Sequence, residues 1–226
     1  MFPYFGVFTH ERYKNPSRDD LKEFFASGEI DIAHFVATCR RVFGAFEPKS
    51  ALEFGCGVGR LLIPLAKLTG HATGVDVADG MLSLARSYAD DAGASVILAK
   101  TIPADEKFDL VLSHITLQHI PPGRGYSLIA QLWGAVAPGG LIVLHVTAFR
   151  TRFNDLLIGS SLLNYDGTRA ESYEETGDET PRILMYDYEL SRVFACMPMA
   201  DGCPLYLEKT DHGGHHGFKI YARKQS

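Results

Sequence analysis

The sequence predicts an α/β protein with a doubly wound, seven-stranded and mostly parallel sheet. Short apolar runs alternate with helical patterns from residue 50 onward, as expected for parallel strands covered on both faces. Two further runs flank a turn rich in glycine and histidine near the end of the chain, which predicts a hairpin and an antiparallel last strand. With 226 residues, 46% of them hydrophobic, the chain can build one large core with an added lid.

The elements follow in order from the hydrophobic periodicity. The expected strands cover residues 50–54, 72–77, 95–100, 108–114, 141–147, 204–211 and 218–224. The expected helices cover residues 58–68, 79–93, 123–137 and 186–197. Pro64 should remove one backbone hydrogen bond inside the first of these helices, and Asp79 is the expected cap of the second. The Pro138-Gly139-Gly140 turn should end the third.

The N-terminal part, residues 1–48, predicts a helical cap that Pro48 ends. Its apolar stripe comprises Ile32, Phe35, Val36, Cys39, Val42 and Phe43. The aromatic residues before it either cover a pocket or pack in the core: Phe2, Tyr4, Phe5, Phe8 and Tyr13. Residues 49–226 form the predicted core domain, with a lid inserted at about 148–185. Six acids between Asp166 and Glu179 make this lid either a solvated face or a surface that prefers a cationic substrate.

Composition excludes several classes of function. A net charge of −5 and a pI near 6.0 disfavour a nucleic-acid partner, and no apolar run is long enough to span a membrane. The first residues lack the pattern of a signal peptide. The four cysteines have no CxxC spacing, which disfavours a zinc site or a disulfide framework and fits reduced thiols. We therefore expect a cytoplasmic protein without a membrane partner.

A glycine-rich turn follows the first expected strand. Glu53 precedes Gly55, Gly57 and Gly59, and the third glycine comes one residue earlier than in the dinucleotide fingerprint. Small residues at a strand-to-helix turn let a ligand approach the backbone closely. Asp76 ends the second strand, where a carboxylate can accept both hydroxyls of a ribose. A tight turn in another doubly wound protein, or a helix-capping role for Asp76, are the alternatives.

These residues resemble the class I S-adenosylmethionine-dependent methyltransferases. The stretch 53–59 is similar to their first motif, "FDLVLSHITLQHI" to their fourth-strand motif, and "LWGAVAPGGLIVLHV" to the helix-turn-strand that follows. The likeness covers roughly residues 50–147. It implies a methyltransferase that uses S-adenosylmethionine, releases S-adenosylhomocysteine and acts on a small-molecule acceptor. The cofactor-binding residues it implies are Glu53, Gly55, Cys56, Gly57, Gly59, Asp76, Val77, Met81, Thr101, Ile102, Ser113 and His114.

Catalytic residues are less well specified. Methyl transfer needs positioning and sometimes a base, and His114 and His119 near the fourth strand are the candidates. His119 could instead have a structural role, and His114 could line the pocket through its backbone. Thr101 and Ile102 stand where many relatives carry an acid for the adenine.

Neither a metal nor an amino-methylating motif is indicated. No acidic cluster follows the fourth and fifth strands, and "SHIT" replaces an Asn/Asp-Pro-Pro-Tyr/Phe motif. For His212, His215 and His216, a hairpin turn is favoured over a metal site. Two other classes stay open: a cofactor-binding regulatory protein without catalysis, and an NAD-dependent dehydrogenase.

Overall fold

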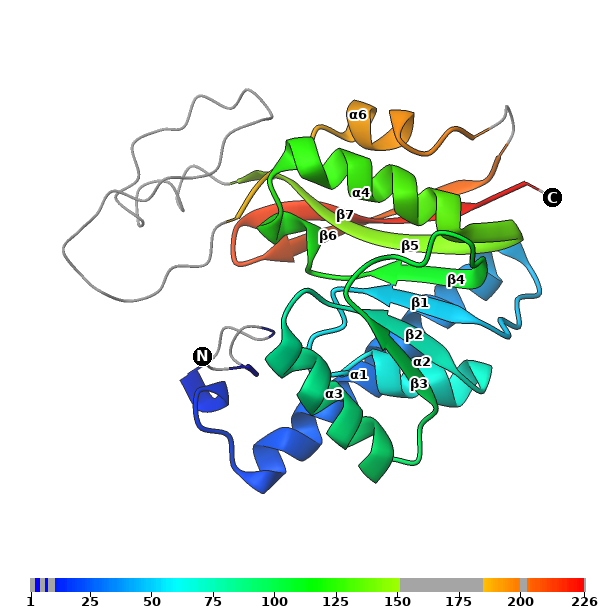
Figure 1. Cartoon of the computed structure of the whole chain (residues 1–226). Helices are drawn as coiled ribbons and strands as arrows, with labels where there is room; N and C mark the ends of the chain where they lie inside the picture. The colour runs from blue at the N-terminus through cyan, green and yellow to red at the C-terminus, as the bar shows by residue number, and fades with distance from the viewer. Residues whose placement is uncertain (1–2, 5–6, 8–10, 151–184, 200–202, 226) are drawn as a thin grey trace.

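A seven-stranded sheet forms the centre of the protein (Figure 1), with the strand order β3-β2-β1-β4-β5-β7-β6. The structure is a computed structural model, and it describes residues 3–4, 7, 11–150, 185–199 and 203–225. The strands are β1 (Ala51–Phe54), β2 (Ala72–Val75), β3 (Val96–Ala99), β4 (Phe108–Ser113), β5 (Val136–Arg150), β6 (Leu205–His212) and β7 (His215–Arg223). Strands β1 to β5 pair in parallel, whereas β7 pairs antiparallel with both β5 and β6. The predicted fold class is confirmed.

Helices cover both faces of this sheet (Figure 1). One face carries α1 (Arg18–Phe43), α2 (Leu62–Thr69) and α3 (Asp79–Asp91), and the other carries α4 (Pro122–Ala135) and α6 (Leu190–Ala195). Two 3-10 turns complete the described elements, η1 (Glu11–Tyr13) and η2 (Leu117–His119). Helices α2, α3 and α4 each connect parallel strands, as a doubly wound sheet requires.

Alternation along the strands divides the buried apolar residues between two cores. Leu52 and Val111 pack toward α4 and α6, whereas their neighbours Ala51 and Leu110 pack toward α1 and α2. Successive side chains of a strand point to opposite faces, so each strand serves both cores. The carboxyl ends of β1, β2 and β4 therefore meet along one rigid edge, where ligands of such sheets bind.

Helix boundaries differ from the expected ones for local reasons. Helix α1 ends at Phe43, with Gly44 at φ 82° as its cap, so Pro48 lies beyond the end. Pro64 lies in the first turn of α2, where the backbone N–H has no partner within the helix itself, and not in the helix interior. Asp79 is the first residue of α3 and makes no capping bond; its carboxylate lies 2.7 Å from Lys100 Nζ.

The glycine pair after α4 does not form a separate turn. Pro138, Gly139 and Gly140 belong to β5, which begins at Val136 directly after the helix. The Gly139 amide donates to the Lys224 carbonyl over 3.0 Å, and the pairing of β4 with β5 shifts register at this place. The helix near residue 190 is also shorter than expected, because it spans only Leu190–Ala195.

The hairpin at the end of the chain is confirmed. Gly213 and Gly214, both with positive φ, join β6 to β7, and His212 lies opposite His215 across the turn. Of the N-terminal aromatics, Tyr13 is buried against Phe24, and Tyr4 contacts Phe24 edge-on. Phe2, Phe5, Phe8, the acidic stretch and nearly all of the expected lid lie outside the described residues.

None of the helices that the structure describes has the length and apolar character to cross a membrane.

Candidate functional site

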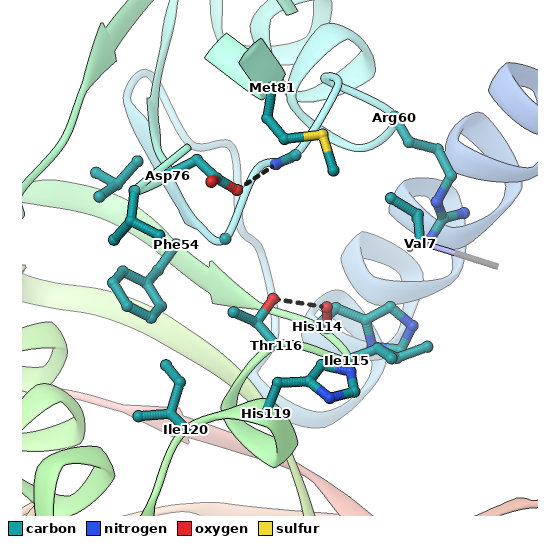
Figure 2. Close-up of a pocket in the computed structure, with 14 residues that line it drawn as sticks. Val7, Phe54, Arg60, Asp76, Met81, His114, Ile115, Thr116, His119 and Ile120 are labelled. Atoms are coloured by element: carbon teal, nitrogen blue, oxygen red, sulfur yellow. Dashed lines mark hydrogen bonds between the residues drawn. The ribbon is translucent and has the colours of Figure 1, made fainter. Parts of the chain in front are cut away.

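A cavity of about 300 Å³ lies at the carboxyl ends of β1, β2 and β4, and we call it the glycine-loop cavity. Its walls are Val7, Phe54, Gly55, Gly57, Arg60, Val75, Asp76, Val77, Met81, His114, Ile115, Thr116, His119 and Ile120. In Figure 2, Asp76 and Met81 lie on one side of this cavity, and His114, Ile115 and His119 lie on the opposite side. The first group follows β2, with Met81 on α3, and the second group follows β4, with His119 in η2. The positions of β2 and β4 in the sheet therefore set their separation.

The loop after β1 brings bare backbone to the cavity. Gly55 has a φ of 79°, and a Cβ built on it would lie 2.3 Å from the Thr116 hydroxyl oxygen. Gly57 has a φ of 52° and faces the cavity, and a Cβ built on it would lie 3.5 Å from the Val7 side chain. A side chain at either position would need the left-handed region, and at Gly55 it would also collide. The spacing of these glycines therefore has a steric cause.

The amides of this loop are largely used within the protein. Gly55 and Cys56 both donate to the Val75 carbonyl, at 2.7 and 3.0 Å, and Gly59 donates to Cys56 over 2.9 Å. Gly57 donates to Asp76 Oδ2 over 3.0 Å. A loop that binds a pyrophosphate points such N–H groups at the ligand. These four donors point inward instead, which argues against a dinucleotide at this site.

Asp76 is the fixed acceptor of the site. It follows β2 directly, and its two carboxylate oxygens accept from Gly57 N (3.0 Å) and Ala78 N (2.9 Å). Each carboxylate oxygen can accept a second hydrogen bond, so two acceptor positions remain at the cavity wall. A local turn of the Asx type and the predicted ligand role are thus compatible in one side chain.

Arg60 connects the loop to α1. Its Nη1 donates to Asp31 Oδ2 over 2.7 Å and to Ser27 Oγ over 3.1 Å, and the side chain is buried. Gly28 lies directly beside this contact, since a Cβ there would come within 2.0 Å of the Arg60 carbonyl oxygen. In a helix, the residue four positions after Arg60 would donate its N–H to the Arg60 carbonyl. That residue is Pro64, which has no N–H, so the carbonyl receives no such bond. Helix α1 can therefore lie against the loop backbone itself.

Glu53 lies beneath the loop in the middle of β1. The residue is 4% exposed, and no described residue hydrogen-bonds to its Oε2. Burial raises the pKa of this carboxyl to about 8; Arg60 opposes the shift, and the negative charge of Asp76 adds to it. Glu53 is consequently protonated at neutral pH and can donate a hydrogen bond.

The opposite wall carries the two histidines. His114 follows β4 directly, and burial together with repulsion from His145 and Arg60 holds its pKa well below the usual value. The imidazole is therefore neutral at physiological pH. Ile115, the next residue, has a φ of 54°, which is rare for a β-branched side chain and places strain at the cavity wall. His119 Nε2 lies 3.3 Å from Gln118 Nε2.

Residues 186–188, which we call the strap, hold the turn that carries His119. Tyr188 is almost fully buried, and its hydroxyl donates to the carbonyls of Leu117 (2.9 Å) and Ile120 (2.7 Å). The Tyr186 amide donates to Gln118 O over 2.7 Å. Residues 186–188 therefore position η2 and with it one wall of the cavity.

A second cavity of about 560 Å³ continues the first one toward the end of β3, and we call it the β3-side cavity. Phe54, Val77, His119 and Ile120 line both. Thr101 and Ile102 line only the β3-side cavity, where the sequence places the base of a nucleoside. Together the two cavities make an elongated site that Asp76 and Val77 flank near the middle.

The structure places most of the predicted residues at these cavities. Seven line the glycine-loop cavity: Gly55, Gly57, Asp76, Val77, Met81, His114 and His119. Four others do not line it and lie in β1, β4 or the loop around it: Glu53, Cys56, Gly59 and Ser113. Their proposed contacts with a ligand stay predictions.

Several lining residues were missed from the sequence. Phe54, Arg60, Ile115 and Thr116 all line the glycine-loop cavity. Arg60 could have been found, because it follows the last glycine directly. The strain at Ile115 leaves no signal in a single sequence. Among the described residues, no group of three His, Cys, Asp or Glu could hold a metal ion.

Comparison with known proteins shows what the chain resembles. Residues 51–140 match a family model described as a methyltransferase domain. The chain is 30% identical over 149 residues to the ubiquinone biosynthesis O-methyltransferase of Hydrogenovibrio crunogenus, covering 58% of this chain and 61% of that protein. It is 34% identical over 103 residues to the protein of the same name from Methylobacterium sp. (strain 4-46), covering 42% and 41%. The matched part is thus less than two thirds of these relatives.

Solved structures share the fold at low identity. The magnesium protoporphyrin IX methyltransferase of Synechocystis PCC 6803, with bound SAH, has a TM-score of 0.63 and 17% identity over 99% of this chain and 98% of its own. An S-adenosylmethionine-dependent methyltransferase of Clostridium acetobutylicum has a TM-score of 0.63 and 15% identity, covering 98% and 99%. Residues 51–140 thus match the model of a methyltransferase domain, and the chain shares its fold, including the strand order described above, with these methyltransferase structures.

Proposed function

We propose that the chain is an enzyme that transfers a methyl group from S-adenosylmethionine to a small-molecule acceptor. The observation that carries this proposal is the Asp76 carboxylate, which two backbone amides hold at the cavity wall with acceptor capacity left over. Ribose hydroxyls are donors that such a carboxylate can bind. The cytoplasm is the proposed compartment, and a small molecule rather than a nucleic acid is the proposed partner.

The residues present fit this cofactor. Asp76 would hold the ribose, and Thr101 and Ile102 would cover the adenine in the β3-side cavity. The bare backbone at Gly55 and Gly57 would lie under the methionine part. When bound, S-adenosylmethionine supplies a methyl carbon activated by a positively charged sulfur.

His114 is the proposed base, and His119 is the weaker candidate. A neutral imidazole can accept a proton, and His114 is held neutral by its surroundings. His119 contacts Gln118 and lies on the turn that Tyr188 fixes, which fits a structural role better. Relatives named O-methyltransferases support a hydroxyl oxygen as the atom methylated here.

Thermal unfolding with S-adenosylmethionine, S-adenosylhomocysteine and NAD tests the cofactor. A ligand present at about 100 times its dissociation constant adds about 2.7 kcal/mol to the free energy of unfolding, which shifts the midpoint visibly. The expected result is a shift with both adenosyl compounds and none with NAD. A shift with NAD alone would establish the dehydrogenase alternative. Release of S-adenosylhomocysteine in the presence of acceptors then separates an enzyme from a regulatory protein that only binds the cofactor.

A further inference from the structure

A third cavity lies behind His114, on the side away from the β3-side cavity. It measures about 450 Å³ and opens between α1, the end of β6 and β7, with Asp31, Glu208, His212 and Lys219 among its walls. We call it the β6-side cavity. Arg60, His114 and Ile115 line both this cavity and the glycine-loop cavity. The two spaces are therefore neighbours that share a wall of three residues.

The three cavities follow one another along the edge of the sheet. The glycine-loop cavity is in the middle, because it shares residues with the β3-side cavity through Val77 and His119 and with the β6-side cavity through His114. A nucleoside on Asp76 and Thr101 would fill the first two spaces. The β6-side cavity, which lies within the usual size range of small-molecule pockets, remains for a second molecule.

We propose that the β6-side cavity is the acceptor-binding subsite and that it takes a small neutral molecule whose hydroxyl group donates to the His114 imidazole. This inference rests on the proposed function, since the acceptor must meet a cofactor held in the glycine-loop cavity. It adds the place and the chemical class of the acceptor.

His114 is built to receive a donor. Its ring packs edge-on against Phe35 and His145, with ring centres 5.2 and 5.4 Å away. No described residue forms a hydrogen bond with the imidazole nitrogens, although the residue lines two cavities. A half-buried polar group needs such a partner, and an acceptor O–H supplies it. In the transfer the acceptor oxygen bonds to the methyl carbon, the electron pair of the broken C–S bond stays on sulfur, and the hydroxyl proton passes to His114.

The charges around the β6-side cavity favour a neutral molecule. Asp31 is paired with Arg60 at 2.7 Å, and Glu208 is paired with Lys219 at 2.9 Å. His34 Nε2 also lies 2.9 Å from Glu208 Oε2. Two further charged residues line the cavity: Asp211 accepts from the Gly214 amide over 2.7 Å, and Lys209 is exposed to solvent. A charged acceptor would have to compete with one of the two pairs or bind at the exposed lysine, where an ion pair contributes little, whereas a neutral acceptor leaves both pairs intact. Ile30, 69% exposed on α1, and Ile115 add apolar surface.

Histidine-ring NMR of the protein saturated with S-adenosylhomocysteine tests the proposal. The probes are 4-methylphenol, benzoate and benzylamine, which have similar size and are neutral, anionic and cationic. We expect 4-methylphenol to shift the ring signals of His114 and His212 and to bind at least about tenfold more tightly than the two charged probes. Assignment uses His114→Gln and His212→Gln.

Blocking variants locate the binding. Ile30→Trp fills the cavity from α1, and Lys209→Trp fills it from β6 should the first variant fold poorly. Each should weaken 4-methylphenol binding at least about tenfold. Glu29→Trp is the matched control, because Glu29 is the exposed neighbour of Ile30 and lies outside the cavity walls.

The outcomes separate the two proposals. If calorimetry on the same sample shows that the wild-type protein does not bind S-adenosylhomocysteine, the proposed function is wrong. Normal S-adenosylhomocysteine binding overturns the subsite if 4-methylphenol leaves His114 and His212 unshifted. The same conclusion holds if a charged probe binds equally well, or if folded Ile30→Trp and Lys209→Trp proteins bind 4-methylphenol like the wild type.

Discussion

The Gly57 amide donates to the Asp76 carboxylate over 3.0 Å, which joins the glycine loop after β1 to the acid after β2. The other carboxylate oxygen accepts from Ala78 at the start of α3. Asp76 is therefore a ligand-binding candidate and also the residue that holds two neighbouring loops in place. A variant at this position has to be tested on both properties.

Asp76→Ala should weaken S-adenosylhomocysteine binding by about 1–3 kcal/mol, the usual cost of removing a hydrogen-bonding partner from a buried donor. The free energy of unfolding should fall as well, because two backbone amides lose their acceptor. Calorimetric titration measures the first effect, and urea unfolding without ligand measures the second.

Asp79→Ala is the matched control for this experiment. Asp79 lies three residues further on, its side chain is 78% exposed, and among the described residues it pairs with Lys100 at the surface. Its removal should leave S-adenosylhomocysteine binding unchanged. Equal affinities for the Asp76→Ala and wild-type proteins would contradict the ribose-binding role.

Gly28→Ala should strongly destabilise the protein. A Cβ at this position would lie 2.0 Å from the Arg60 carbonyl oxygen, and that oxygen belongs to backbone that cannot rotate away. Helix α1 would have to move off the glycine loop, and overpacking of this kind costs about 1–3 kcal/mol. Urea unfolding of the ligand-free protein measures the change.

Gly80→Ala is the control, and its effect should have the opposite sign. Gly80 lies in α3, and apart from its chain neighbours and the backbone of its own helix, no atom of the described residues lies within 4 Å of the position that its Cβ would take. Alanine forms helices better than glycine, so a gain of up to about 1 kcal/mol is expected. If Gly28→Ala were as stable as Gly80→Ala, the close contact between α1 and the loop would be wrong.

The fold could be predicted because its signals are local and repeated. Seven apolar runs correspond to seven strands, and the glycines of the loop and of the last hairpin mark turns that only glycine adopts easily. Some element boundaries differ from the predicted ones. Gly44 ends α1 before Pro48 is reached, and Gly139 is drawn into β5 by its bond to Lys224, which lies far away in the sequence.

The cavity-lining residues that the sequence predicts lie close together in the chain, and the contacts it does not predict join distant segments. Asp76 and the glycines belong to one unit of β1, loop, α2 and β2, so their spacing carries the information. The contact of Arg60 with Asp31 and the hold of Tyr188 on η2 join segments far apart in the chain. One sequence does not contain such pairings, because they depend on how the helices pack on the sheet.

Tyr188→Phe should reduce the free energy of unfolding by about 1–3 kcal/mol. The hydroxyl donates to the carbonyls of both Leu117 and Ile120, and in the phenylalanine variant these acceptors lose their donor. Because Ile120 lines both the glycine-loop and the β3-side cavity, S-adenosylhomocysteine binding should also weaken. Urea unfolding and calorimetry measure the two effects.

Tyr206→Phe provides the comparison. Tyr206 lies in β6, and its hydroxyl makes no hydrogen bond with the described residues. Its loss should change stability by less than about 0.5 kcal/mol. If the two tyrosine variants behaved alike, the strap would not hold the turn that carries His119.

Glu53 makes the stability of the protein depend on pH. Its pKa in the folded state, about 8, exceeds the ordinary value of 4.5 that the unfolded chain shows. Between these two values the folded state binds the extra proton, so this residue lowers stability as the pH rises from about 5 to 8. The slope is on the order of 1 kcal/mol per pH unit, since one proton is involved.

Glu53→Gln should remove this slope. At pH 5 the wild-type carboxyl is protonated in the folded state and resembles the amide, so the two proteins should differ little in that region. At pH 8 the variant should be more stable by roughly 2–4 kcal/mol, because it has no buried carboxylate to desolvate. Urea unfolding at pH 5, 6.5 and 8 measures the free energy of unfolding of both proteins. Taking their difference cancels the titration of all other groups.

Glu47→Gln, at an exposed position, is the control, and its free energy of unfolding should change with pH as that of the wild type does. Parallel curves for Glu53→Gln as well would show that Glu53 stays ionised beneath the loop, and the assignment of a protonated donor there would be withdrawn.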